Sequence, residues 1–369
     1  MLDFTSSLYL GLRHPSAGLR PWEALTLGRP AALRPPPGAA EVGIRLADLQ
    51  GCEASTLLPS TLHLFFDLFG MLGRQDTTIY IEATTYPIAE WGVQRGAPAG
   101  TPVRTFPSGD AIELERLITR AAARWHRPLI VCDAMRPGCD RQPPLARYAA
   151  LAARHDGFLV IDDTQGLGVF GHGARHGCPW GIGGGGSLRH HGLAGPRIIV
   201  GASLAKGFGV PMAALSGSRA LVRFFEARSQ TRVHTSPPSV AMIHAAWHAL
   251  TINRRCGDAL RLRLLQRVRQ FRERIARLPL SATGNEFPVQ SLVAARGIDA
   301  AALHAGLLRR RVRTVLQRDA DTGAARLGFI FTAAHTSDCI DRAVDALAQA
   351  LRALRPPALA SAGTFLETS

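Results

Sequence analysis

The sequence has almost no lysine. Of its 43 basic residues, 42 are arginine, and Lys206 is the one lysine in 369 residues. Arginine performs most electrostatic roles of lysine, but it does not readily lose its proton and does not form a Schiff base. A lysine retained in this background predicts chemistry that requires an amine at Lys206. The alternative is that a single lysine has survived by chance.

Long apolar runs and paired metal ligands are also missing. No apolar run approaches the roughly 18 residues of a membrane span, and Met1–Leu12 lacks the basic residue that precedes the apolar stretch of a signal peptide. The six cysteines include no C-x-x-C pair, and His190 and His191 have no further spaced partners. We therefore expect a cytoplasmic protein with reduced cysteines, no membrane span and no metal site.

Acidic residues are too few to balance the arginines. The formal net charge is +15 and the pI is near 11.0, a balance that occurs in nucleic-acid-binding proteins. No zinc finger, helix-turn-helix or alternation of basic and aromatic residues accompanies the arginines. We therefore expect solvated arginine-rich helix faces and no nucleic-acid partner, with an acidic partner or surface, such as an acidic carrier protein, as the second interpretation.

Short β-branched runs alternate with helical patterns in the N-terminal and central parts of the chain. Leu129–Cys132 and Phe158–Ile161 predict buried strands of a mostly parallel sheet, and Leu145–Arg154 between them has apolar residues at helical spacing. This strand–helix–strand order predicts an α/β fold. We also expect strands at Thr77–Glu82 and Arg197–Val200, and helices at Pro87–Gly92 and Pro107–Arg124, the second with Ser108 as its N-cap.

The pattern changes after Pro237 and Pro238, where a long helical stretch, Val240–Leu278, begins. It predicts a separate, smaller α+β domain. We therefore expect an N-terminal arm (1–40), a large domain (41–240), a small C-terminal domain (241–355) and a loose tail (356–369). Within the small domain we expect strands at Gln290–Ala294 and Arg326–Thr332 and helices at Ala300–Arg311 and Thr336–Ala353.

A glycine-rich segment, Gly181–Gly186, precedes Ser187–Leu193. Gly183–Gly186 does not stand between a strand and a helix, so it does not predict a phosphate-binding loop. We expect this segment to be a mobile insertion at the surface.

Lys206 and Asp162 each follow a predicted strand. The segment Arg197–Gly209 reads RIIVGASLAKGFG, in which the strand leads to Ser203, Lys206 and a Gly-x-Gly pair. Open α/β sheets hold ligands at the carboxyl ends of their strands, where a serine hydroxyl can bind phosphate. A carboxylate that emerges there, as Asp162 does, needs a cationic partner such as a pyridinium nitrogen, unless it caps the following turn.

These motifs resemble the pyridoxal 5'-phosphate (PLP) enzymes of fold type I, and among them the α-oxoamine synthases. The resemblance rests on Asp162–Gly166 (DDTQG) and Ser203–Gly209 (SLAKGFG) and runs nearly from end to end. It implies a large domain with a mostly parallel central sheet, a smaller α+β C-terminal domain, and PLP as the cofactor. Further similar segments are Phe4–Leu12, Gly51–Ala54, His234–Pro238, Ala325–Leu327 and Thr332–Thr336.

The resemblance also implies residue roles. Lys206 would hold PLP through a Schiff base and act as the base at the substrate α-carbon, and Asp162 would keep the pyridine nitrogen protonated. Arg326 would bind the substrate carboxylate as a bidentate fork. The other expected cofactor contacts are Ser203, Ser60 and Thr61 with the phosphate, Gln165 with the phenolic oxygen, Tyr86 stacked on the ring, and Thr235 with the phosphate of the neighbouring subunit in a homodimer.

Several positions depart from the family pattern. Gln165 stands where the family has a histidine that contacts the phenolic oxygen. Thr84 and Thr85 replace an Asn-His pair, which leaves Tyr86 as the nearest aromatic residue that could stack on the ring. Pro59, Ser60 and Thr61 replace the glycine-rich turn of the phosphate loop, and Gly328 replaces the second arginine of an Arg-Leu-Arg motif.

The leading hypothesis is an enzyme that condenses an amino acid with an acyl thioester of coenzyme A or acyl carrier protein. Loss of carbon dioxide would then give an α-amino ketone. The second hypothesis is an aminotransferase or another α-carbon reaction on the same scaffold. A catalytically idle cofactor-binding or partner protein is less consistent with Lys206, because an idle site needs no amine.

Overall fold

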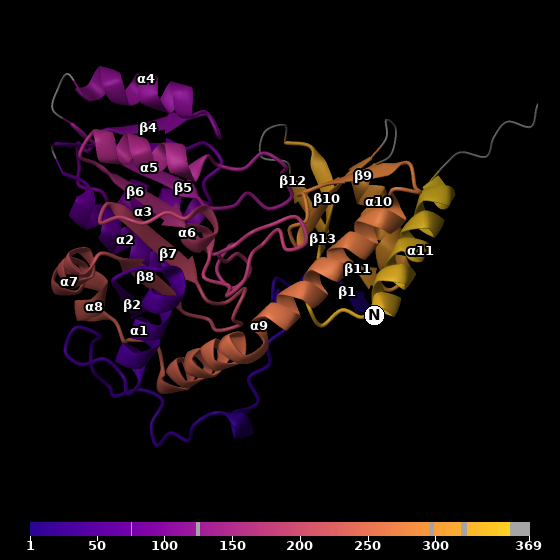
Figure 1. Cartoon of the computed structure of the whole chain (residues 1–369), viewed down its shortest axis with the longest axis horizontal. Coiled ribbons are helices and arrows are strands. Elements are labelled where there is room, and N and C mark those ends of the chain that lie inside the picture. Colours follow the sequence, from indigo (N-terminus) through magenta and orange to yellow (C-terminus); the bar gives the residue numbers. More distant parts are fainter. Residues whose placement is uncertain (75, 123–125, 295–298, 319–322, 355–369) are drawn as a thin grey trace, which may run out of the picture.

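A seven-stranded sheet lies at the centre of one half of the molecule (Figure 1). The computed structural model describes residues 1–74, 76–122, 126–294, 299–318 and 323–354. Neighbouring strands of this sheet pair in parallel except β8, which is antiparallel to both of its neighbours. In spatial order the strands are β2 (Ala54–Leu58), β8 (Ala213–Gly217), β7 (Ile198–Ser203), β6 (Phe158–Asp162), β5 (Arg127–Asp133), β3 (Thr77–Glu82) and β4 (Val103–Phe106).

The central strands are apolar on both faces. On β5, Leu129 and Val131 pack into one hydrophobic cluster, whereas Ile130 and Cys132 pack into another on the opposite face. Successive side chains of a strand point to opposite faces, so a continuous apolar run requires cover on both sides. Helices α2 (Thr61–Leu72), α3 (Pro87–Gly96) and α7 (Arg219–Arg228) cover one face, and α4 (Ala111–Ala122), α5 (Leu145–Arg154) and α6 (Ser187–His191) cover the other.

The helix α9 (Val240–Ile275) connects two hydrophobic clusters over its 36 residues. Its N-terminal part, including Ile243, packs with α1 (Ala39–Gln50). Its C-terminal part, including Leu264 and Phe271, packs with the second sheet. Figure 1 shows α9 running from the seven-stranded sheet to the smaller part of the molecule.

The second sheet is antiparallel and has four strands. The N-terminus joins this part of the molecule, because β1 (Leu2–Asp3) pairs in parallel with β11 (Val312–Arg313). In spatial order the sheet contains β12 (Val315–Arg318), β13 (Ala325–Ile330), β10 (Val289–Ala294) and β9 (Leu280–Thr283), with α10 (Ala300–Arg309) and α11 (Ser337–Leu354) beside it.

The α/β class with a mostly parallel sheet is confirmed. Predicted elements Thr77–Glu82 and Leu145–Arg154 coincide with β3 and α5, and the others differ by a few residues at the ends that the structure describes. The predicted helix end at Arg124 lies outside the described residues. The predicted N-cap of α4 is wrong: Asp110 Oδ1 accepts hydrogen bonds from the first turn, whereas Ser108 Oγ pairs with Thr84 Oγ1 at 2.6 Å. An aspartate one residue before the helix reaches its free N–H groups more directly.

We propose to divide the chain as the sequence predicts, with the N-terminal arm at 1–40, the large domain at 41–240 and the small domain at 241–355. The predicted loose tail, 356–369, lies outside the described residues.

Within the described ranges, no helix has both the length and the apolar character needed to cross a membrane.

The glycine-rich segment lies at the surface only in part, so that expectation is wrong for its centre; residues 182, 189, 191 and 192 are exposed. Residues 184–188 are buried. A Cβ atom at Gly185 would collide with the carbonyl oxygen of Leu49. The run of glycines therefore permits close backbone packing, which the sequence pattern alone does not distinguish from mobility.

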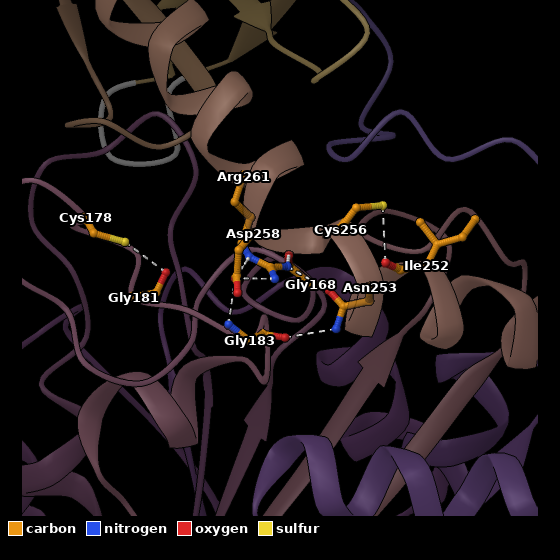
Figure 2. A network of polar contacts seen from close by, with 9 residues as sticks. All are labelled: Gly168, Cys178, Gly181, Gly183, Ile252, Asn253, Cys256, Asp258 and Arg261. Carbon is orange, nitrogen blue, oxygen red and sulfur yellow. Dashed lines mark hydrogen bonds and ion pairs between the residues drawn. The ribbon is translucent and has the colours of Figure 1, made fainter.

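Arg261 on α9 fixes the loops of this region (Figure 2). Its side chain is 3% exposed and its Nη1 donates to Gly168 O at 2.9 Å and to Asn253 Oδ1 at 2.8 Å. Its Nη2 donates to Asp258 Oδ1 at 2.7 Å, and the same oxygen accepts a hydrogen bond from Gly183 N at 2.9 Å. Asn253 Nδ2 also donates to Gly183 O at 2.9 Å, so α9 holds both ends of the loop between Gly168 and Gly183.

Asp163 anchors the same segment from the large sheet. Its carboxylate accepts hydrogen bonds from Ser187 N at 2.8 Å and Ser187 Oγ at 2.6 Å. Burial raises the pKa of Asp163 to about 7, although the bonds from Ser187 oppose the increase. This carboxyl group therefore titrates near neutral pH.

Replacement of Arg261 by Met should destabilise the protein. The variant retains much of the side-chain volume but leaves Gly168 O and Asn253 Oδ1 without their donor, so we expect a loss of about 2–4 kcal/mol in the free energy of unfolding. Urea denaturation followed by circular dichroism measures this loss. Arg263→Met, an exposed change on the same helix, is the control, and equal midpoints for the two variants would contradict the role of Arg261.

Asp163 should make stability depend on pH. Its pKa is about 7 in the folded protein against 3.8 in the reference state, so the folded state binds the proton more tightly. Its contribution to the free energy of unfolding is full below pH 4 and is lost as the pH rises towards 7, by ~4 kcal/mol at most. Asp163→Asn should flatten this fall, as measured by urea denaturation at several pH values. The same slope in variant and wild type would show that Asp163 does not titrate in this range.

Candidate active site

A cavity of about 880 Å³ opens at the carboxyl ends of the parallel strands β3, β5, β6 and β7. Residues that follow each of these strands line it, and residues of the four-stranded sheet close its other side. A more apolar cavity of about 470 Å³ lies at the amino ends of the same strands and contains none of the predicted site residues. The larger cavity brings together Lys206, Asp162, Gln165, Ser203, Thr61, Tyr86 and Arg326 from the predicted set.

Lys206 follows β7 and lines the cavity. Burial lowers the pKa of its ammonium group, while Asp162 and Asp133 oppose this shift. Its Nζ lies 5.9 Å from the ring centroid of Tyr86. The one lysine of the chain thus lies where deprotonation is easier than at the surface.

Asp162 ends β6 and is fixed by its neighbours. Its Oδ1 accepts a hydrogen bond from Thr164 N at 2.9 Å, and Thr164 Oγ1 in turn accepts one from Ser203 N at 2.9 Å. Burial raises the pKa of Asp162, and the bonds from Thr164 and the charge of Lys206 oppose the increase. These contacts hold the ends of β6 and β7 in one arrangement.

Asp133 lines the cavity but is not among the residues predicted from the sequence. It ends β5 and pairs in register with Asp162 on the neighbouring strand. Tyr86 N donates to both oxygens of its carboxylate, at 3.2 Å to Oδ1 and 3.1 Å to Oδ2. Burial and the charge of Asp162 raise its pKa well above the usual range. The signal was available, because Asp133 follows the run Leu129–Cys132 as Asp162 follows Phe158–Ile161.

The N-terminus of α2 borders the cavity through Thr61. Ser60 is the N-cap of this helix, with its Oγ accepting from His63 N at 3.5 Å, and it is not among the cavity-lining residues. Ser203 Oγ accepts a hydrogen bond from Ala205 N at 3.2 Å. The first N–H groups of a helix favour phosphate, so Thr61 stands where an anion would be stabilised.

Of the two remaining predicted residues, Arg326 lines the main cavity and Thr235 does not. Arg326 lies on β13 and contributes to the main cavity and to an adjacent cavity of about 430 Å³, which Arg136 and Arg141 also line. Thr235 does not line the main cavity, and its Oγ1 donates to Thr231 O at 2.7 Å. One chain therefore assembles the predicted carboxylate-binding arginine with Lys206, but not Thr235.

Residues 4–347 match the family model of aminotransferase class I and II. The chain belongs to this family. It is accordingly a PLP-dependent transferase, and the predicted resemblance, enzyme class and cofactor are confirmed.

Individual members of the family are similar over most of the chain. The 8-amino-7-oxononanoate synthase of Dechloromonas aromatica (strain RCB) is 33% identical over 75% of this chain and 69% of its own length. A serine palmitoyltransferase structure with PLP superposes with a TM-score of 0.83 at 16% identity, over 95% of this chain and 87% of that one. An 8-amino-7-oxononanoate synthase from Francisella tularensis superposes with a TM-score of 0.73 at 17% identity, over 95% of this chain and 98% of that one. These structures confirm the predicted fold type I.

The cavity of this family member fits PLP. It offers an amine at Lys206, a carboxylate at Asp162 and a helix N-terminus at Thr61. Thr85 Oγ1 is buried and has no hydrogen-bond partner in the described part of the chain, so its hydroxyl is available to a bound polar group. Among the described residues, no group of three or more His, Cys, Asp or Glu side chains is arranged to hold a metal ion.

Tyr86 should contribute to cofactor affinity through its ring. Tyr86 is 57% exposed, and the centroid of its ring lies 5.9 Å from Lys206 Nζ. Tyr86→Phe should retain PLP affinity, whereas Tyr86→Ala should weaken it several-fold, up to roughly tenfold, through loss of an aromatic contact. Titration of the apoprotein with PLP by absorbance measures this. Trp91→Ala, an exposed aromatic change outside the cavity lining, is the control, and an equal effect at Trp91 would contradict the prediction.

Proposed function

We propose that this enzyme condenses an amino acid with an acyl thioester and releases carbon dioxide, giving an α-amino ketone. The observation that carries the proposal is the placement of Lys206, the one amine side chain, beside the buried Asp162 in a cavity at the carboxyl ends of the sheet. The named relatives support the reaction type, because 8-amino-7-oxononanoate synthase forms such a product. The acyl donor is a thioester of coenzyme A or of an acyl carrier protein.

In this proposal Lys206 binds the cofactor and moves the proton at the substrate α-carbon. PLP, when bound, supplies an electron sink for negative charge at that carbon. Burial lowers the pKa of Lys206, which makes the neutral amine easier to reach. The carboxylate of Asp162 stabilises a protonated pyridine nitrogen, because an opposite charge in a desolvated site favours the cation.

Arginine and polar groups hold the ligands in place. Arg326 binds the substrate carboxylate through its planar fork of donors. Ser203 and Thr61 bind the cofactor phosphate together with the N-terminus of α2, which Ser60 caps. Gln165 binds the phenolic oxygen, and Tyr86 stacks on the ring.

We further propose that the enzyme is a cytoplasmic homodimer in which Thr235 reaches the phosphate of the neighbouring subunit. Support comes from the position of Thr235, which lies outside the cavity of its own chain. The net charge of +15 is compatible with an acidic carrier protein as the donor. If light scattering shows a monomer and that monomer is fully active, the shared site is excluded, whereas the proposed reaction is unaffected.

The products distinguish condensation from transamination. Incubation of the PLP-loaded enzyme with one amino acid and an acyl thioester should release carbon dioxide and free thiol in equal amounts. Transamination would instead give a keto acid and the amine form of the cofactor, with the thioester unused, and that result would contradict the proposal. Absorbance changes on addition of single amino acids identify which one to use.

Lys206 should be the single side chain that carries the cofactor. Borohydride reduction of the PLP-loaded protein should attach the pyridoxyl group to one internal peptide, because no other lysine exists. Lys206→Arg should abolish both the labelling and thiol release, since guanidinium does not form a Schiff base. Mass spectrometry of the digested protein measures the labelling, and modification that persists in Lys206→Arg would refute the assignment.

A further inference from the structure

Tyr9, in the N-terminal segment, reaches the cavity from outside the large sheet. Its side chain is 1% exposed, and its hydroxyl donates a hydrogen bond to Gln165 Oε1. Both residues line the cavity. Gln165 is one of the predicted site residues, whereas the sequence predicts no role for Tyr9, because 156 positions separate the two residues.

The backbone and ring of Tyr9 are fixed independently of Gln165. Its carbonyl oxygen accepts a hydrogen bond from Ala333 N at 2.7 Å, and its N–H donates to Ser7 O at 2.8 Å. Its ring packs edge-on against Phe287, with centroids 5.5 Å apart. The hydroxyl therefore approaches Gln165 from a rigid support built by the four-stranded part of the molecule.

The hydroxyl acts as the donor in this pair. Burial raises the pKa of Tyr9, so the group keeps its proton at all working pH values. Gln165 Oε1 is the one acceptor that the hydroxyl has among the described residues. A flipped amide would leave this buried O–H without an acceptor, which costs more than the exchange of one hydrogen bond for another.

The direction of the Gln165 amide follows from this contact. Its oxygen accepts the hydrogen bond from Tyr9, and its nitrogen has no hydrogen-bond partner within the described part of the chain. The half that remains for a cavity ligand is thus the N–H donor. A donor at this position attracts an oxyanion, whereas the amide oxygen would repel one.

We propose that Tyr9 is a positioning residue that holds the Gln165 amide with its N–H group towards the cavity, where it donates to the phenolic oxygen of the cofactor. The inference rests on the proposed function. It makes the N-terminal segment part of the cofactor site and explains how a neutral residue works where the family has histidine. Gln165 can take the place of the family's imidazole because Tyr9 fixes the orientation of its N–H donor.

The two residues should be coupled in a double-mutant cycle. Tyr9→Phe removes only the hydroxyl, and we expect PLP affinity to fall roughly three- to tenfold and the pH midpoint of the cofactor absorbance band to shift. In a Gln165→Ala background the same change should alter PLP affinity by less than about twofold, because its target is gone. Absorbance titrations of the four proteins give all of these values.

A matched control separates positioning from general stability. Tyr80 is also 1% exposed, and its hydroxyl donates to Leu117 O of α4 at 3.3 Å, outside the cavity lining. Tyr80→Phe should lower stability without moving the pH midpoint. Equal losses of PLP affinity for Tyr9→Phe in the wild-type and Gln165→Ala backgrounds would overturn the inference. Failure of the wild type itself to bind PLP would instead overturn the proposed function.

Discussion

The parallel pairing of β5, β6 and β7 is the constraint on which the cavity depends. Parallel strands end at the same edge, so the register that opposes Asp133 to Asp162 also brings both carboxyl groups near Lys206. Burial disfavours every one of these charges taken alone, and the attraction of the two carboxylates to the Lys206 ammonium group limits the cost. The hydrophobic faces of the sheet therefore determine where the polar chemistry is placed.

The sequence predicted this arrangement well where the pattern is local. Apolar runs followed by Asp162 and Lys206 locate strand ends, because a buried strand leaves few choices for its pairing. Asp133 has the same local signal and could have been found in this way. Tyr9 and Arg261 could not, since their partners lie 156 and 93 positions away, and only the folded chain brings those groups together.

Glycine was the least informative residue type in the sequence. The run Gly181–Gly186 has the composition of a mobile loop, yet its backbone packs where side chains would collide. A glycine can adopt many backbone conformations. In this segment the hydrogen bonds of the buried Arg261 and Asp163 fix one of them. The N-cap of α4 is a similar case, in which two nearby polar residues compete and geometry decides between Ser108 and Asp110.

The scarcity of lysine has a consequence for an enzyme that handles reactive thioesters. Such donors acylate neutral amines without any catalyst, and surface lysines are the usual targets. Guanidinium groups stay protonated and do not compete as nucleophiles. With 42 arginines and a single lysine that lines the cavity, this protein keeps a strongly cationic character and offers such donors no lysine amine other than that of Lys206.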